Sequence, residues 1–292
     1  MADQHPHPRA TWCDPTTGET LDGRALMTRM AGRQAVLLGE THDVAEIHRW
    51  QAHVVAWLHQ IQPRLAVGFE MFPRRLQPVL DEWVAGALST ADFIVKSEWD
   101  AVWGFPPEIY LPIFHFCRQN GVPMLALNCH RPLVTRVGTD GWDAIPEDER
   151  DGLTPSAPAT PAYRRYLFDI TGRNRIPGPT GGARSPDDPA FDRFVRAQQT
   201  WDRAFACNIA RALEAGIADT VVGIIGRGHL EYGGGTPHQL ADLGIRDVAV
   251  LLPNQQETLA IEPDRRLADA VFRLDTPEPP AARRARARLV AG

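Results

Sequence analysis

The feature that most constrains the fold is an alternation of short apolar runs, rich in residues that favour β-structure, with longer segments of helical periodicity. The apolar runs at 35–38, 65–69, 123–127, 220–225 and 248–251 are predicted strands. Between the first two, residues 45–61 place large apolar side chains on one face at helical spacing, and 76–88, 110–120 and 188–215 are further predicted helices. This alternation is typical of an α/β fold, with a central, mostly parallel sheet and helices on both faces.

The chain divides into three parts by composition. Residues 1–20 are expected to form a flexible N-terminus, and residues 21–255 are expected to form one α/β domain. Within that domain, a Pro- and Gly-rich stretch at about 138–190 loses apolar periodicity and is predicted to be a lid or a partly helical insertion. Residues 256–292 form a C-terminal extension, in which 258–261 and 270–274 are predicted as a hairpin or as edge strands. Its basic tail carries Arg283, Arg284, Arg286 and Arg288.

Polar side chains follow four of the predicted strands at the point where each strand ends. Glu40 and His42 follow the first strand, Glu70 follows the second, His130 the third and His229 the fourth. In open α/β sheets, ligands bind outside the carboxyl ends of the strands. If the four strands are parallel and adjacent, these side chains converge on one cleft, which is enough for a metal or a haem site. Each of them also has a simpler interpretation as a capping, packing or surface residue.

The charge composition narrows the chemistry. The chain has 31 Lys and Arg residues and a net charge of −5, and Lys96 is its single lysine. No glycine-rich loop precedes Lys96, so we set aside phosphate-loop and Schiff-base lysine chemistry. The net charge gives no reason to expect a nucleic acid partner. No stretch approaches the roughly 18 uninterrupted apolar residues that a membrane span requires, so we expect no membrane-spanning segment.

Other motifs are excluded by their spacing. The four cysteines form no Cys-x-x-Cys pair, which argues against a zinc knuckle and a thioredoxin-like motif. The first βα unit has no Gly-x-Gly-x-x-Gly, and the chain has no Gly-x-Ser-x-Gly elbow, so neither a dinucleotide site nor a serine hydrolase is expected. Because no His-Glu-x-x-His helix is present, any metal would be gathered from several strands.

Motifs at and between the strand ends resemble those of a known family and run from about residue 36 to residue 252. They are Gly39-Glu40-Thr41-His42-Asp43, Phe69-Glu70-Met71-Phe72, Gln77-Pro78, Trp99 with Trp103-Gly104, Tyr110 with Pro112-Ile113, Asn128, Gln199-x-Trp201-Asp202, and Gly226-x-Gly228-His229 with Gly233 and Pro237. In these motifs the chain is similar to the ChaN-type, iron-regulated haem-binding proteins. The wider superfamily includes the Tiki and TraB metal-dependent proteases and is similar in fold to the erythromycin-esterase type.

The resemblance implies a central sheet with flanking helices, a cleft at the strand ends and haem binding, with a homodimer interface as one place for the haem. The polar cluster that it implies consists of Glu40, His42, Glu70 and His229. A tyrosine or a histidine is the expected iron ligand. The candidate cofactor-binding residues are Tyr163, Tyr166, Tyr232 and His130, together with Arg74, Arg75, Arg131 and Arg227, which follow strand ends and could pair with haem propionates.

Two functions remain open from the sequence. The first is haem binding, in haem or iron uptake or handling. The second is a Tiki-like metal-dependent hydrolase, a peptidase or an esterase, in which the polar cluster binds Mn, Co or Zn and activates a water molecule. Members of the resembling family are commonly exported lipoproteins, whereas Cys13 follows no apolar run and the first residues lack the pattern of a secretion signal. We therefore expect a cytoplasmic protein rather than a periplasmic or lipid-anchored one.

Overall fold

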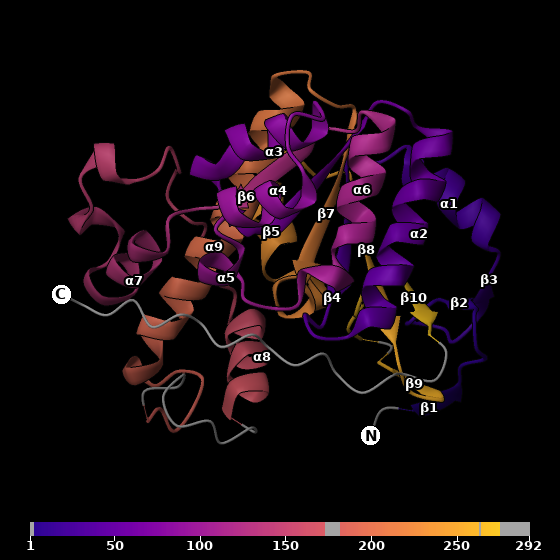
Figure 1. Ribbon diagram of the computed structural model, residues 1–292. Coiled ribbons are helices and arrows are strands. Elements are labelled where there is room, and N and C mark those ends of the chain that lie inside the picture. The colour runs from indigo at the N-terminus through magenta and orange to yellow at the C-terminus, as the bar shows by residue number, and fades with distance from the viewer. Residues whose placement is uncertain (1–2, 173–181, 263, 275–292) are drawn as a thin grey trace.

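The computed structural model describes residues 3–172, 182–262 and 264–274, and an eight-stranded sheet lies at the centre of this described part (Figure 1). The strands of that sheet are β2 (Trp12–Cys13), β3 (Thr20–Leu21), β4 (Ala35–Glu40), β5 (Leu65–Pro73), β6 (Met124–Asn128), β7 (Thr220–Gly226), β8 (Val248–Asn254) and β10 (Ala270–Arg273). They follow one another in the order β3-β2-β10-β8-β4-β7-β5-β6. A separate pair consists of β1 (Asp3–Pro6) and β9 (Thr258–Ile261).

Neighbouring strands from β10 to β6 all run parallel, whereas β2 pairs antiparallel with β10 and with β3. The prediction of a mostly parallel central sheet is therefore confirmed, and all five predicted strands are present. Because β4, β7, β5 and β6 are consecutive neighbours, their carboxyl ends lie along one edge of the sheet. That edge is where the polar residues that follow the predicted strands are placed.

Helices connect the strands. The α-helices are α1 (Gly23–Ala31), α2 (Ala45–Ile61), α3 (Gln77–Val84), α4 (Thr90–Lys96), α5 (Trp99–Val102), α6 (Leu111–Asn120), α7 (Arg131–Asp140), α8 (Pro161–Gly172), α9 (Asp192–Glu214) and α10 (Thr236–Asp242). Short 3₁₀ turns are η1 (Arg74–Leu76), η2 (Pro107–Ile109), η3 (Trp142–Ala144), η4 (Glu147–Glu149), η5 (Pro189–Phe191), η6 (Arg227–His229) and η7 (Glu231–Gly233). The helix predicted at 45–61 has the same bounds as α2.

Both faces of the sheet are covered, because successive side chains of a strand point to opposite sides. On β4, Val36 and Leu38 pack into a core with side chains of α1 to α6. Ala35 and Leu37 of the same strand pack into a second core with α9 and α10. In Figure 1, α2 and α6 lie side by side along the first face. The predicted helices on both faces are therefore confirmed.

The stretch at about 138–190 is partly helical. It contains the end of α7, the turns η3 and η4, and the helix α8. Tyr163 and Tyr166 of α8 pack with Phe191 and with Val195 of α9 in a small apolar cluster. These apolar contacts were not predictable from the sequence of the stretch, which lacks apolar periodicity. Residues 173–181 lie outside the described part.

The ends of the described chain contribute strands to the sheets. The segment 1–20, expected to be flexible, contains β1 and β2, and Trp12 of β2 pairs with Phe272 of β10. The hairpin alternative for 258–261 and 270–274 is wrong, because β9 pairs with β1 and β10 extends the parallel sheet beside β8. The tail with Arg283 to Arg288 lies outside the described residues, and the domain boundaries stay a prediction. Among the described helices, none combines the length and the apolar character needed to cross a membrane.

Candidate functional site

A pocket of about 570 Å³ lies at the carboxyl edge of β4, β5, β6 and β7, and we call it the strand-edge pocket. Its lining consists of His42, Glu70, Met71, Pro73, Arg75, Glu98, Ala101, Val102, Trp103, Phe105, Asn128, Cys129, His130, Arg131, Pro132, Trp201, Phe205 and His229. The structure thus brings together four of the side chains singled out from the strand ends, namely His42, Glu70, His130 and His229. Glu40 lies behind this lining.

Glu40 is the last residue of β4, and its carboxylate is hydrogen-bonded to the His42 ring on the side away from the pocket. Its carboxylate is buried and accepts hydrogen bonds from His42 Nδ1 at 2.7 Å, from the Tyr110 hydroxyl at 2.9 Å and from the Gln51 amide at 3.2 Å. Burial by itself raises the pKa of Glu40, but the imidazoles of His48 and His42 and the Tyr110 hydroxyl outweigh it and hold that pKa below its usual value. Both oxygens have protein partners, so Glu40 orients an imidazole instead of facing a ligand.

His42 presents its other ring nitrogen to the strand-edge pocket. While Nδ1 of His42 is hydrogen-bonded to Glu40, its Nε2 lies 3.9 Å from Glu70 Oε1. The His42 side chain is 33% exposed. The ring packs edge-on against Trp103, with ring centres 4.6 Å apart. Burial lowers the pKa of His42, but the hydrogen bond to Glu40 and the charge of Glu70 outweigh burial and raise it to about 9. The imidazole is therefore protonated at neutral pH.

Glu70 and Gly226 join neighbouring strands at the floor of the pocket. Glu70 is buried at the end of β5, and its Oε2 accepts a hydrogen bond from the backbone N–H of Gly226. A Cβ atom at Gly226 would lie 2.9 Å from His42 Cε1 and 3.2 Å from Glu70 Oε2. Glycine is required at this position because the His42 ring and the Glu70 carboxylate approach the β7 backbone so closely.

His229 is paired with a buried carboxylate from α9. Its Nδ1 lies 2.8 Å from Asp202 Oδ1, and that carboxylate also accepts hydrogen bonds from the Tyr163 hydroxyl at 2.7 Å and from Thr236 at 3.0 Å. Burial lowers the pKa of His229, but the charge of Asp202 outweighs it and raises that pKa. The Gln198 amide nitrogen lies 3.0 Å from His229 Nδ1 and 3.2 Å from Nε2, so it contacts the face of the imidazole ring.

Sequence reasoning missed Asp202 and Gln198 as functional residues. Asp202 belongs to the Trp201-Asp202 motif that helped to identify the family resemblance, but no role could be assigned to it there. The two residues are four apart on α9 and both are buried, so they share the helix face that contacts His229. A buried carboxylate on that helix face is the signal that could have indicated a partner for a histidine.

The walls and the rim of the strand-edge pocket differ in character. The walls carry Trp103, Phe105, Trp201 and Phe205. The rim carries His130 and Arg131, which lie at the start of α7, together with Arg75. Arg75 forms a bidentate ion pair with Glu98, with both N···O distances at 2.6 Å. The pocket therefore combines an aromatic interior with charged groups of both signs at its mouth.

The three candidate tyrosines are not part of the strand-edge pocket lining. Tyr163 donates to Asp202, Tyr166 donates to Glu231 at 2.7 Å, and Tyr232 donates to Glu262 at 2.9 Å. Burial, the first cause in each case, and the neighbouring carboxylates raise the pKa of all three phenols. Each hydroxyl is thus kept protonated. Arg227 also lies outside the lining and forms an ion pair with Glu231 at 2.5 Å.

The polar cluster does not have the geometry of a metal site. Within the described residues, no group of three or more His, Cys, Asp or Glu side chains is arranged to hold a metal ion. Both oxygens of Glu40 are used in hydrogen bonds inside the protein. The divalent-metal alternative therefore finds no support in this arrangement.

An open, mostly parallel sheet with a pocket at its carboxyl edge is the arrangement in which α/β proteins commonly bind ligands. A family model described as "Haem-binding uptake, Tiki superfamily, ChaN" matches residues 26–240, and the chain belongs to that family. The resemblance inferred from the sequence motifs is thereby confirmed.

Comparison with solved structures shows the same fold. ChaN of Campylobacter jejuni, in a structure that describes cofacial haem binding, is 18% identical with a TM-score of 0.69, and the match covers 89% of this chain and 95% of that chain. An erythromycin esterase mutant in its open conformation is 12% identical with a TM-score of 0.53, covering 92% of this chain and 98% of that chain. No curated protein matches this chain.

Proposed function

We propose that the strand-edge pocket binds haem and that the protein acts in haem uptake or handling. One observation carries this proposal: the pocket combines aromatic walls with an imidazole, His42, whose Nδ1 is held by a buried carboxylate and whose Nε2 is on the pocket side. Metal-binding histidines typically have such a carboxylate on their second ring nitrogen. Family membership supports the same ligand.

The other residues of the pocket fit the parts of a haem. The porphyrin ring is flat and apolar, and Trp103, Phe105 and Phe205 offer aromatic surface on the walls. The two propionates are anionic, and Arg131 lies at the mouth of the pocket, where a guanidinium can bind a carboxylate with two hydrogen bonds. Bound there, haem supplies an iron centre for which the pocket offers a nitrogen ligand.

We assign the iron ligand to His42 in preference to the three tyrosines and to His229. The hydroxyls of the tyrosines donate to carboxylates away from the pocket lining, and the His229 side chain is only 12% exposed, against 33% for His42. The Nε2 atom of His42 must lose its proton to bind iron. Its raised pKa makes this loss cost free energy at neutral pH.

The test is a hemin titration followed by the Soret absorption band. We expect wild type to show a saturable band, and we expect His42→Ala to weaken haem binding by at least about tenfold. His238→Ala is the matched control, because His238 is outside the pocket and bonds to the Pro158 carbonyl. No saturable band in wild type would refute haem binding. A band lost in Tyr166→Phe but kept in His42→Ala would assign the iron to a tyrosine.

Hydrolysis of an ester or amide is the second candidate, and it is favoured by the pairing of both pocket imidazoles with buried carboxylates. Such a carboxylate fixes the orientation of a histidine that moves protons in catalysis. The test is turnover of p-nitrophenyl acetate in the presence of EDTA. Turnover that is lost in His229→Ala supports this function, and turnover unaffected by that change excludes the pocket as its site.

A further inference from the structure

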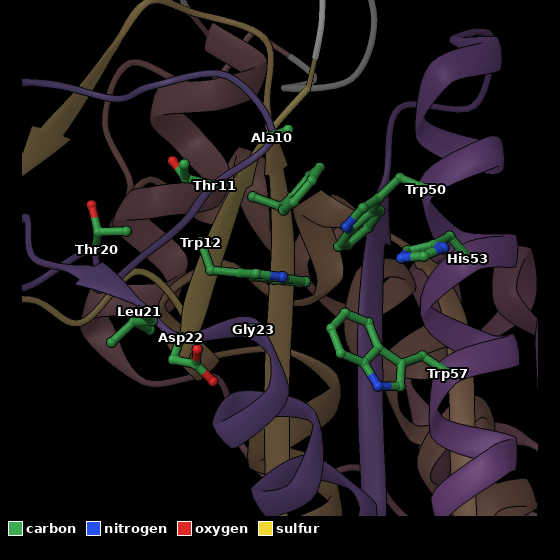
Figure 2. Close-up of a pocket in the computed structure, with 11 residues that line it drawn as sticks. Ala10, Thr11, Trp12, Thr20, Leu21, Asp22, Gly23, Trp50, His53 and Trp57 are labelled. Atoms are coloured by element: carbon green, nitrogen blue, oxygen red, sulfur yellow. The ribbon is translucent and has the colours of Figure 1, made fainter.

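A second pocket, of about 560 Å³, lies near the end of the sheet formed by β3, β2 and β10, between these strands and the helices α1 and α2 (Figure 2). We call it the tryptophan pocket, after Trp12, Trp50 and Trp57, which line it together with Phe272 and Gly23. It shares no lining residue with the strand-edge pocket. The family resemblance gives these residues no role.

The aromatic side chains come from three separate segments. Trp50, His53 and Trp57 share one face of α2, at the spacing of successive helical turns. Trp12 of β2 and Phe272 of β10 come from paired strands, and their ring centres are 5.0 Å apart. The ring centres of Trp12 and Trp50 are 6.0 Å apart. Figure 2 shows the three indoles around a common space.

Gly23 keeps that space open between two of the indoles. A Cβ atom at this position would lie 3.3 Å from Trp12 Cδ1 and 3.4 Å from Trp57 Cη2. The first distance is closer than ordinary van der Waals contact and the second is at its lower limit, so a larger side chain would push against the Trp12 ring and touch the Trp57 ring. Gly23 is the first residue of α1, and a side chain at this position would enter the pocket.

The indole nitrogen of Trp50 is a second, independent observation. Trp50 is 4% exposed, and its Nε1–H has no hydrogen-bond partner among the described residues. Buried donors in folded proteins are nearly always satisfied, because an unsatisfied one loses its hydrogen bond to water without replacement. Figure 2 shows this nitrogen on the side of the ring that faces the pocket. The nitrogen itself has almost no exposed surface, so an acceptor that enters the pocket reaches this donor when the indole ring shifts towards it.

We propose that the tryptophan pocket binds a flat aromatic molecule that carries a hydrogen-bond acceptor, a carbonyl oxygen or a ring nitrogen, at its edge. The ring stacks on the indoles of Trp12 and Trp57, and the acceptor takes the hydrogen bond from Trp50 Nε1–H. The carboxylate of Asp22 lies at the pocket and caps α1 through Ala25 N at 2.7 Å. This negative charge favours a neutral or cationic ligand and disfavours a polyanion.

The experiment uses nicotinamide, a flat ring with a carbonyl acceptor, and follows the indole N–H signals of the full chain labelled with ¹⁵N. We expect the Trp50 signal, assigned from its loss in Trp50→Phe, to move downfield in a saturable way. Trp50→Phe keeps an aromatic wall but removes the donor, and we expect it to weaken binding about three- to tenfold. Gly23→Ala narrows the gap between the indoles, and we expect it to weaken binding by about tenfold or more.

Two matched variants control for general effects. Trp142→Phe alters an indole on η3 outside the pocket, and Gly32→Ala adds a Cβ whose nearest neighbour is at 3.7 Å. Both should bind nicotinamide as wild type does. Hemin binding to Gly23→Ala should also be unchanged, which separates this site from the strand-edge pocket.

Three outcomes would overturn the proposal. The first is the absence of saturable binding by wild type. The second is binding that Gly23→Ala leaves unchanged, which would place nicotinamide elsewhere even if Trp50→Phe proved unstable. The third is equal binding of benzene or of tetramethylammonium, because benzene lacks the acceptor and tetramethylammonium lacks the ring; equal binding would identify the pocket as a simple apolar cavity or as a cation cage.

Discussion

Replacing Glu40 by glutamine tests how the strand-edge pocket is held together. The carboxylate of Glu40 is the main partner of His42, whose pKa rises from 6.5 to about 9. A shift of that size corresponds to about 3.4 kcal/mol of preference for the charged imidazole in the folded state. Since 33% of the His42 side chain is exposed, solvent screening reduces this figure, and about 1.5–2 kcal/mol is the contribution we expect.

The contribution depends on pH in a defined direction. The pKa of His42 is higher in the folded protein, about 9, than in the unfolded chain, about 6.5. Its stabilisation is therefore fully present below pH 6.5 and is lost as the pH rises through about 9. Glu70 and Asp43 also raise this pKa and stay in place in Glu40→Gln, so we expect the pKa of His42 to fall by about one unit rather than to its unfolded value.

The assay compares the free energy of unfolding in urea at pH 6 and pH 10, with the pKa of His42 followed by NMR. Loss of the contacts that Glu40 makes to Gln51 and Tyr110 destabilises Glu40→Gln at both pH values. The part due to His42 is the difference between the destabilisation at pH 6 and the destabilisation at pH 10. We expect the destabilisation to be about 1 kcal/mol larger at pH 6. Glu214→Gln, on the exposed end of α9, is the control without such a difference. Equal destabilisation at both pH values, with the pKa still near 9, would refute the reasoning.

Three further predictions follow from the same contacts. Asp202→Asn removes a buried charge that holds His229, so we expect a loss of about 3 kcal/mol in urea unfolding and a lower pKa of His229 in an NMR titration. Gly226→Ala places a Cβ 2.9 Å from His42 Cε1, so hemin titration should show at least about tenfold weaker binding in a protein with an unchanged circular dichroism spectrum. Arg75→Ala breaks an ion pair whose side chains are 44% and 45% exposed, and urea unfolding should show a loss of less than about 1 kcal/mol. A larger loss for Arg75, or none for Asp202, would contradict these assignments.

Much of the fold could be predicted because its signals are local. The apolar run before Glu40 marks β4, and the periodicity of 45–61 marks α2, with no knowledge of the rest of the chain. Strand partners are a different matter, because pairing depends on which segments meet after folding. The segments 258–261 and 270–274 look alike as β-rich runs, yet they belong to separate sheets.

The chain positions of Glu40, Glu70 and His229 are enough to place them at the carboxyl edge once β4, β5 and β7 are parallel neighbours. The role of each side chain depends instead on packing between distant parts of the chain, which the sequence pattern does not reveal. Packing of α9 against the sheet brings Asp202 to His229, and packing of α6 brings Tyr110 to Glu40. Such contacts join residues far apart in the chain, and a buried carboxylate or phenol takes its hydrogen bonds from whatever partner the packed core brings within reach.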